Sequence, residues 1–417
     1  MRANSAAPSI CLVVQAFYDL DARVMRKAEA LVAAGYSVDV LALRPSHGKK
    51  CYVQNGVNVY TVSLGKLRGS LARYAFEYAA FLLWAFFRLA VLMRSRQYAV
   101  IDVNTLPDFL IFAAAPARWA GAKLLLDMHE ITPEFYRSKY GVSEGSWIDR
   151  LLKYQERMSF DYADHVLTIN QPIQDLLVRR GLPASKSTIV MNAADERRFA
   201  ASPASATRLE VGSAANKFVM MYHGTLTKIY GLDIALEAFA IAHHDMPNAE
   251  LWILGPGPEL KPLAQLTEKL GLSSKVKLMG PVPSADIPGW LAQCTVGILP
   301  IRCDVFLDFA FPNKLPECVL AGKPVIVSRL KAIRHYFSEE AVAYFEPTNI
   351  RELAAQMVRL RRDPALRAKL KKCARQEYEP IRWSVMKNRY LAVIDTLANP
   401  FSSQAIDQPT LRAGRLH

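Results

Sequence analysis

Paired cysteines are missing from this sequence, and so are repeats and low-complexity tracts. Its six cysteines are widely separated, and no two of them form a CxxC pair. A disulfide framework and a structural zinc site are therefore not expected, and a reducing cytosol fits best. The apolar stretch near the N-terminus is too short for a signal peptide and leads directly into a predicted strand, so secretion is not expected.

Two motifs of nucleotide and metal chemistry are also absent. The sequence has no GxGxxG, the glycine pattern of dinucleotide-binding turns, which argues against a dinucleotide site. His129 stands close to Glu130 and Glu134, but the HExxH spacing of zinc proteases is not formed and the ligand count is short. Metal binding is therefore not expected at this segment.

Acidic residues are fewer than basic ones. The chain has 52 Lys and Arg against 38 Asp and Glu, a formal net charge of +14. Such an excess predicts attraction to an anionic partner. No helix-turn-helix, RNP or zinc-finger pattern supports nucleic acid. A phosphorylated small molecule or an acidic membrane surface is the expected partner.

No segment has the roughly 20 consecutive apolar residues that cross a membrane. The longest run, Tyr78–Phe87, is bounded by Glu77 and Arg88. Two interpretations remain open for a helix near 74–93: a buried helix, or an interfacial helix on an anionic membrane surface. We favour the second. It predicts that the lipid-facing side chains are Phe81, Leu82, Trp84 and Phe86. It also predicts that lipid headgroups are bound by Arg68, Arg73, Arg94 and Arg96.

The length of 417 residues suggests two domains, and the pattern of the chain agrees. Short apolar runs alternate with helical patterns, which indicates parallel sheets covered on both faces. Ligands of such doubly wound domains bind beyond the carboxyl ends of the strands, here in a cleft between the domains. We predict an N-terminal domain over 1–195, a C-terminal domain over 217–380, a helix over 381–397 that packs back on the N-terminal domain, and a flexible tail over 398–417.

The predicted strands are Ser9–Val14, Ser37–Leu43, Val57–Val62, Val100–Val103, Lys123–Met128, His165–Ile169, Ser187–Met191, Phe218–His223, Glu250–Leu254, Val276–Met279, Val296–Leu299, Pro324–Val327 and Ala341–Phe345.

The segment FPNKLPECVLAGKPVIVS, residues 311–328, carries the strongest chemical signal. A helix is predicted near Lys314–Ala321, and the N-terminus of a helix presents free N–H groups and a partial positive charge to a phosphate. Lys314 adds a full cation, and Glu317 can accept hydrogen bonds from two neighbouring hydroxyls, as on a ribose. The alternative is an ordinary capped helix start in solvent.

This segment resembles glycosyltransferase family 4, the retaining transferases of the two-Rossmann GT-B fold. Glu317 followed by AGKPVI matches the second half of the family's paired-glutamate motif, so the resemblance implies ribose binding by Glu317. Where the family has its first Glu, this chain has Phe309, with Asp308 one place earlier. Asp308 is the candidate for the sugar contact, and Asn313 belongs to the same donor loop.

Three further segments carry the resemblance. MMYHGTLTKIYGLDIALEAF resembles the start of the family's C-terminal domain and includes Gly224 and Thr225. Many members have Arg and Lys on the diphosphate where Thr225 and Tyr230 stand here, so that task is assigned to Lys228 and Lys314. LWILGPGPE contributes Gly255 near the donor, and VKLMGPVP contributes Val282 near the base.

On the N-terminal side the resemblance implies that His129 lies beside the donor sugar and the acceptor. Asp21 and Arg23 could face the ligand, but a helix N-cap and a solvated first turn are favoured for them.

The resemblance implies an α/β GT-B enzyme with two Rossmann-like domains. It would be a retaining glycosyltransferase that moves a sugar from a nucleotide diphosphate sugar to a polyprenyl-linked or glycan acceptor in polysaccharide or exopolysaccharide biosynthesis. The predicted catalytic residues are His129, Lys228 and Lys314. No cofactor is expected, and the nucleotide sugar is a substrate. The expected location is cytoplasmic, peripheral on the inner face of the cell membrane. A nucleotide-sugar epimerase on the same fold and a non-catalytic basic binding protein remain as alternatives.

Overall fold

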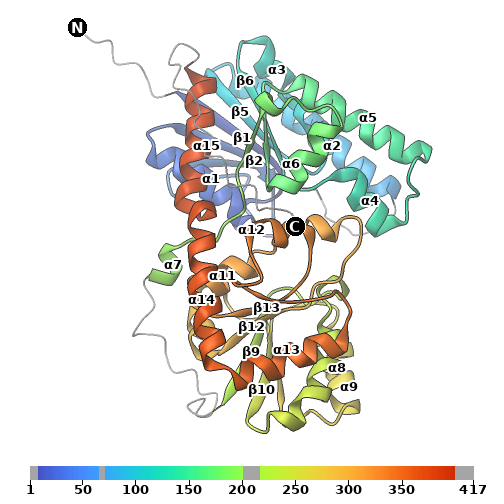
Figure 1. Ribbon diagram of the computed structural model, residues 1–417. Helices are drawn as coiled ribbons and strands as arrows, with labels where there is room; N and C mark the ends of the chain where they lie inside the picture. Colours follow the sequence, from blue (N-terminus) through green and yellow to red (C-terminus); the bar gives the residue numbers. More distant parts are fainter. Residues whose placement is uncertain (1–7, 65–70, 201–216, 400–417) are drawn as a thin grey trace. The chain divides into compact units, whose positions relative to one another are not determined.

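The chain forms two compact units (Figure 1). This computed structural model describes residues 8–64, 71–200 and 217–399. The N-terminal unit comprises Met1–Asn192 and Val385–His417, and the C-terminal unit comprises Ala193–Ser384. Arg68, most of the segment between the two predicted domains and nearly all of the predicted tail lie outside the described residues.

Eight strands form the sheet of the N-terminal unit, in the order β3-β4-β2-β1-β5-β6-β7-β8. All neighbours are parallel except β3 and β4. The strands are β1 (Ser9–Phe17), β2 (Ser37–Leu43), β3 (Cys51–Gln54), β4 (Val57–Val62), β5 (Tyr98–Asn104), β6 (Lys123–Met128), β7 (His165–Thr168) and β8 (Ser187–Ile189).

The apolar runs predicted the buried strands of this sheet. Strands β2, β4 and β6 begin and end at the predicted residues. Strand β3 was not predicted, because its side chains alternate between exposed and half-buried at the edge of the sheet. An edge strand of this kind lacks the continuous apolar run that marks a strand covered on both faces.

Helices cover the N-terminal sheet, and their starts follow from local capping. Asp21 caps the first helix, because its side chain accepts hydrogen bonds from the backbone N–H groups of Arg23 and Val24. Ser146 and Asn170 cap later helices in the same way. The helical segments are η1 (Tyr18–Leu20), α1 (Ala22–Ala33), α2 (Leu71–Leu92), η2 (Asp108–Ala114), α3 (Ala115–Trp119), α4 (Thr132–Tyr140), α5 (Trp147–Tyr162), α6 (Gln171–Arg179), η3 (Ala184–Lys186) and α15 (Trp383–Ala398).

Helix α2 contains the long apolar run. One face of it is core: Phe81, Ala85 and Leu89 are fully buried. The opposite face is apolar and exposed, with the side chains of Phe76, Leu83, Phe87 and Val91. The prediction that Phe81 faces lipid is therefore wrong, because the helical repeat turns it toward the sheet. None of the helices in the described residues is long and apolar enough to cross a membrane.

The flanking arginines of α2 differ from one another. Arg96 was predicted to bind lipid headgroups, but its Nη1 lies 2.5 Å from Oδ1 of the buried Asp39. A buried carboxylate needs a cation, so Arg96 neutralises Asp39 inside the N-terminal unit. Arg73 and Arg94 are exposed.

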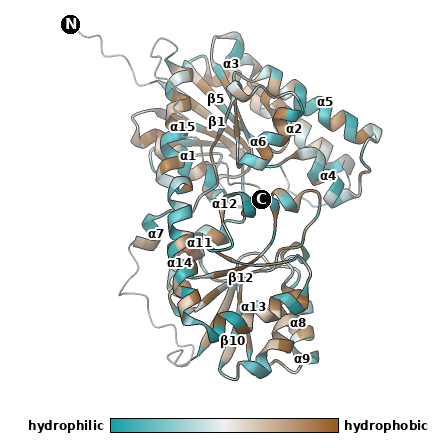
Figure 2. Ribbon diagram, viewed as in Figure 1, coloured by the Kyte–Doolittle hydropathy of each residue, from teal (hydrophilic) through white to brown (hydrophobic). Residues whose placement is uncertain are grey.

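Six parallel strands form the sheet of the C-terminal unit, in the order β11-β10-β9-β12-β13-β14. Their side chains are almost all buried, and Figure 2 shows the brown of apolar residues along strands of both sheets. The strands are β9 (Phe218–His223), β10 (Ala249–Leu254), β11 (Val276–Gly280), β12 (Val296–Leu299), β13 (Val325–Ser328) and β14 (Ala343–Phe345).

The helices of the C-terminal unit alternate with its strands, as in a doubly wound fold. They are α7 (Arg197–Ala200), η5 (Lys228–Tyr230), α8 (Leu232–Ala242), η6 (His243–Asp245), α9 (Leu260–Lys269), η7 (Ser284–Asp286), α10 (Ile287–Gln293), η8 (Leu307–Phe309), α11 (Lys314–Leu320), α12 (Lys331–Tyr336), α13 (Ile350–Arg362), α14 (Pro364–Tyr378) and η9 (Glu379–Ile381).

Candidate functional site

Glycines follow the carboxyl ends of two adjacent strands in the C-terminal unit and bring their loops into contact. Gly224 follows β9 with φ +121°, and Gly255 follows β10 with φ +135°. The N–H of Gly224 donates to the carbonyl of Leu254 at 2.9 Å. A Cβ at Gly255 would lie 2.0 Å from the carbonyl oxygen of Gly224. Only glycine allows both this backbone conformation and this approach, so the two predicted donor-binding glycines lie together.

Glu317 is paired with a histidine that the motif comparison did not identify. Its Oε2 lies 2.6 Å from Nε2 of His223, the last residue of β9. His223 is 3% exposed, and its buried Nδ1 has no hydrogen-bond partner among the described residues. Burial acts to raise the pKa of Glu317. The hydrogen bond from His223 and the charges of His223, Arg198 and Lys314 outweigh it, so that pKa lies below its ordinary value.

Arg198, in the short helix α7, is a second residue that the sequence did not indicate. Its Nη1 lies 3.7 Å from Oε1 of Glu317, and its Nη2 donates to the carbonyl of Ser284. Arg198 thus links Glu317 to the loop after β11, where Val282 is half-buried. Nothing in the surrounding sequence pattern marks this arginine, because it approaches Glu317 from more than a hundred residues away in the chain.

Lys314 begins α11 and its ammonium group faces aromatic rings. Nζ lies 3.9 Å from the centre of the Tyr230 ring and 5.3 Å from that of Tyr222, in the range of cation–π contacts. Its Cε would be 2.4 Å from a Cβ at Gly224, so Lys314 lies directly against the glycine turn. Burial lowers the pKa of Lys314 to about 8, against the opposing effect of Glu317. Lys314 is therefore a cation beside the glycine turn, and burial disfavours its charged form.

Lys228, the other predicted phosphate-binding cation, lies on the surface at the start of η5. Its side chain is exposed, and no contact joins it to Lys314 among the described residues. Its carbonyl accepts a hydrogen bond from Nε of Arg302 at 3.0 Å. Thr225 is also exposed, and its carbonyl accepts from the hydroxyl of Tyr222 at 2.9 Å.

Two predicted residues near α11 have different surroundings. Asn313 is exposed at the N-terminus of the helix, and its side chain makes no capping hydrogen bond. Asp308 lies in η8, and its Oδ1 accepts from the backbone N–H of Lys331 at 2.8 Å, at the start of α12. One carboxylate oxygen of Asp308 is therefore used in holding a neighbouring helix.

His129 lies in the N-terminal unit, directly after β6. Its Nε2 is 3.2 Å from Oδ1 of Asn104 and 3.3 Å from Oδ2 of Asp127. Glu134 does not join it but pairs with Arg180. No group of three or more His, Cys, Asp or Glu side chains in the described parts of the chain is arranged to hold a metal ion.

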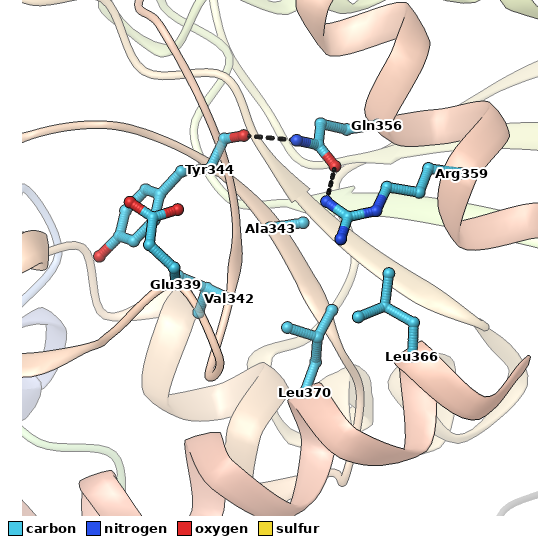
Figure 3. A pocket seen from close by; sticks show the side chains of 8 residues that line it. All are labelled: Glu339, Val342, Ala343, Tyr344, Gln356, Arg359, Leu366 and Leu370. Atoms are coloured by element: carbon cyan, nitrogen blue, oxygen red, sulfur yellow. Dashed lines mark hydrogen bonds between the residues drawn. The ribbon is translucent and has the colours of Figure 1, made fainter. Parts of the chain in front are cut away.

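A small cavity in the C-terminal unit lies away from all of these residues (Figure 3). It has a volume of about 30 Å³, which holds no more than a few water molecules. Gln356 and Arg359 meet above it, and Nε2 of Gln356 donates to the carbonyl of Tyr344 at 2.9 Å. The cavity is a packing feature of β14, α13 and α14, too small for a nucleotide sugar.

Two doubly wound units define the class of protein as GT-B. Sucrose-phosphate synthase from Thermosynechococcus elongatus matches with a TM-score of 0.76 at 18% identity, covering 94% of this chain and 99% of that one. HepE from Anabaena, solved with UDP and glucose, matches with a TM-score of 0.68 at 20% identity, covering 93% and 99%. WaaG, a glycosyltransferase involved in lipopolysaccharide biosynthesis, matches with a TM-score of 0.68 at 15% identity, covering 94% and 100%.

Sequence comparison then gives the family. The profile "Glycosyl transferase 4-like domain" matches residues 20–193, and "Glycosyl transferases group 1" matches residues 217–363. The chain belongs to this glycosyltransferase family, and the predicted membership and fold are confirmed.

Curated relatives agree with the family. D-inositol 3-phosphate glycosyltransferase of Corynebacterium urealyticum is 26% identical over 339 residues, 76% of each chain. D-inositol 3-phosphate glycosyltransferase 1 of Catenulispora acidiphila is 26% identical over 199 residues, 45% of this chain and 46% of that one. The lipopolysaccharide core glycosyltransferase LpsD of Rhizobium meliloti is 30% identical over 164 residues, 39% of this chain and 45% of that one. The last two matches span less than half of each relative.

Proposed function

We propose that this protein is a retaining glycosyltransferase that moves a sugar from a nucleotide diphosphate sugar to a lipid-linked or glycan acceptor in polysaccharide biosynthesis. One observation carries the proposal: Glu317, Lys314 and Gly224 meet at the carboxyl end of β9, where doubly wound folds bind nucleotides. Family membership and a relative solved with UDP-glucose support a nucleotide sugar as the donor.

In this proposal, different side chains of the C-terminal unit bind different parts of the donor. Glu317 accepts hydrogen bonds from the ribose hydroxyls, because its low pKa keeps it an acceptor. Lys314, which lies against the glycine turn, faces the diphosphate. Negative charge grows on the diphosphate as the glycosidic bond breaks, so a cation placed there favours the transition state over the ground state. Lys228 has a supporting role from the surface, and the chain itself needs no resident cofactor.

The acceptor and the stereochemistry are the finer parts of the proposal. Relatives named for inositol phosphate and for lipopolysaccharide core synthesis support an acceptor rich in hydroxyl groups. No carboxylate among the described site residues is placed as a nucleophile, since Glu317 is held by His223 and Arg198. Retention would then follow from attack on the same face as departure, with the leaving phosphate taking the acceptor's proton.

Peripheral attachment to the inner face of the cell membrane also belongs to the proposal. A second exposed apolar stripe supports it, on helix α5: Trp147, Leu151, Tyr154 and Met158. Helices α2 and α5 both pack against η2, and exposed arginines flank both stripes. Apolar side chains bordered by cations suit an anionic bilayer surface.

Incubation with a panel of nucleotide sugars, with and without glycan acceptors, tests the proposed function. Transfer that requires an acceptor, with the anomeric configuration of the donor kept in the product by NMR, is the expected result. Donor turnover without an acceptor would indicate an epimerase, and no turnover with any donor would indicate a binding protein.

A further inference from the structure

His223 is the last residue of β9 and lies directly before the glycine turn of the C-terminal unit. Strand β9 pairs with β10 on one side and β12 on the other, so the backbone that carries the imidazole is held in place. The side chain is buried, and its Nε2 lies 2.6 Å from Oε2 of Glu317 in the first turn of α11. Since Nδ1 has no partner among the described residues, the contact with Glu317 is the hydrogen bond that this ring makes there.

The two carboxylate oxygens of Glu317 have different surroundings. Oε2 faces the buried ring of His223, whereas no hydrogen bond reaches Oε1 among the described residues. Nη1 of Arg198 lies 3.7 Å from Oε1, close enough for an ion pair but longer than a hydrogen bond. The Glu317 side chain is 18% exposed. Because a buried partner already occupies Oε2, the oxygen left for a ligand is Oε1.

The hydrogen bond between these two side chains runs from His223 to Glu317. Burial acts to raise the pKa of Glu317, but the hydrogen bond from His223 and the nearby cations bring that pKa below its ordinary value, so the group is a carboxylate at neutral pH. A carboxylate has acceptors only, and Nε2 therefore carries the hydrogen. A glutamate has three rotatable side-chain bonds, whose freedom is lost when it binds a ligand. A donor on a fixed strand restricts that freedom before the ligand arrives, which favours binding.

We propose that His223 is a positioning residue: its Nε2–H holds Oε2 of Glu317, so that Oε1 accepts hydrogen bonds from the ribose hydroxyls of the nucleotide and the site selects ribose over deoxyribose. The inference rests on the proposed glycosyltransferase function, which gives Glu317 its ribose contact. It adds a residue that touches no part of the donor and acts only through Glu317. Its loss should therefore affect recognition of the ribose hydroxyls more than recognition of the diphosphate.

Paired nucleotides separate this positioning from binding in general. Calorimetry gives the dissociation constants of UDP, GDP and ADP and of their 2′,3′-dideoxy analogues. The dideoxy value divided by the ribose value is the ribose ratio. For the nucleotide that binds most tightly we expect a wild-type ribose ratio of about 10 to 100, the scale of hydrogen bonds to a charged group. In Glu317→Ala the ratio should fall to about 1, because no carboxylate remains to accept these bonds.

Two amides of different length then replace the ring of His223. The amide nitrogen of His223→Gln reaches the position of Nε2, whereas that of His223→Asn reaches only the position of Nδ1 and donates nothing to Glu317. We expect the ribose ratio of His223→Gln to stay within about twofold of the wild type, and that of His223→Asn to fall by about three- to tenfold. His223→Leu has no donor at all and should behave like His223→Asn, which provides a second variant where the first does not fold.

His165 provides the matched controls, since its ring bonds only Thr188 among the described residues. His165→Asn and His165→Gln should keep the wild-type ribose ratio. Thermal melting of every variant shows which proteins are folded. A side chain with a purely structural role would weaken both members of a nucleotide pair equally and leave the ratio unchanged.

The outcomes distinguish the inference from the proposed function. A wild-type ratio in folded His223→Asn or His223→Leu, beside a lost ratio in Glu317→Ala, would overturn the positioning role alone. An equal fall in His223→Gln and His223→Asn would do the same, because the donated hydrogen bond would then not be the cause. An unchanged ratio in Glu317→Ala, or a wild type that binds none of the three nucleotides, would refute the proposed donor site and the inference with it.

Discussion

Both units have ionic groups at the carboxyl ends of their parallel sheets. The group in the N-terminal unit is fully buried and is called the sealed network, whereas the group in the C-terminal unit is partly exposed to solvent and is called the open cluster. In the N-terminal unit Lys27, Asp102 and Asp127 are 0% exposed. In the C-terminal unit the side chains of Glu317 and Arg198 are 18% and 33% exposed. A sealed network cannot exchange its partners with a ligand, so it can only hold neighbours such as His129. A partly open pair can exchange one partner for a ribose hydroxyl.

The two clusters also differ in how much stability the loss of one ion costs. Removing one ion from a sealed network leaves its partner buried and unpaired, which costs stability. Removing one ion from the open cluster leaves Arg198 or Glu317 partly in contact with water, so stability should change less than in the sealed network and binding should change more. Substitutions in the N-terminal network should therefore act mainly on folding stability, and substitutions in the C-terminal cluster mainly on donor binding.

The largest expected effect is on folding of the N-terminal unit. Lys27→Met should lower the free energy of unfolding by about 3–5 kcal/mol, because the buried Asp102 then loses its cationic partner and Asp127 loses one of its two. Lys123→Met is the matched control, since Lys123 pairs with Asp164 at the surface and such pairs contribute about 0–1 kcal/mol. Urea unfolding followed by circular dichroism measures both. Equal losses in the two variants would remove the distinction between sealed and open clusters.

The next largest effect is on catalysis in the C-terminal unit. Lys314→Ala should lower kcat by about 100- to 1,000-fold, the usual result of deleting one group that stabilises transition-state charge. Lys228→Ala should also slow transfer, but less, because its exposed ammonium group is screened by water. Steady-state kinetics at saturating donor tests both. Wild-type turnover in Lys314→Ala would exclude Lys314 from the reaction.

Donor affinity should depend on Glu317. Glu317→Ala should weaken nucleoside diphosphate binding by about 1–3 kcal/mol, because charged hydrogen bonds to the ribose are not made. Thermal melting should also fall, because the buried His223 loses the partner of its Nε2. Glu339→Ala, which removes a surface partner of Arg329, is the control. Unchanged affinity in calorimetry would contradict ribose binding by Glu317.

Lys314 also predicts how binding varies with pH. Its pKa is lowered to about 8, so the free protein carries this charge below about pH 8 and loses it above. Affinity for the diphosphate should fall as pH rises through 8, by at most about tenfold per pH unit for one proton. Lys314→Arg keeps its charge throughout and should flatten the profile. A wild-type profile that is flat between about pH 7 and 10 would show that Lys314 does not contact the diphosphate.

The smallest effects concern the outer surface of the N-terminal unit. Arg73→Gln and Arg94→Gln should each weaken binding to anionic vesicles by about 1 kcal/mol, and added salt should weaken it further. Leu83→Ser with Phe87→Ser should release the protein while leaving its melting temperature nearly unchanged, because both side chains are exposed. Phe81→Ser is the contrasting variant and should lower stability by several kcal/mol. A wild type that never floats with anionic vesicles would exclude the membrane surface.

The sequence by itself determined the order of the buried strands, because continuous apolar runs such as Phe218–His223 and Lys123–Met128 are the local signature of buried parallel strands. It also predicted that Glu317, Lys314 and the two glycines form one donor site, and Lys314, Gly224 and Gly255 do lie side by side. Their motifs are short, and the carboxyl ends of neighbouring parallel strands meet at one edge of a sheet. The face of α2 that is buried was not assigned correctly, because a helix that is apolar all around has no sequence signal for its inner side.

Only the tertiary structure decided which charges are partners. His223, Arg198 and Asn104 reach Glu317 and His129 from strands and helices distant in sequence, and no local pattern encodes such pairs. The pairing of Lys27 with Asp102 and Asp127 likewise joins α1 to β5 and β6. The physical reason is that a charge is buried only where folding delivers its counterion, and that depends on how elements pack. Apolar periodicity is a local property of the sequence, whereas the pairing of buried charges depends on which distant elements pack together.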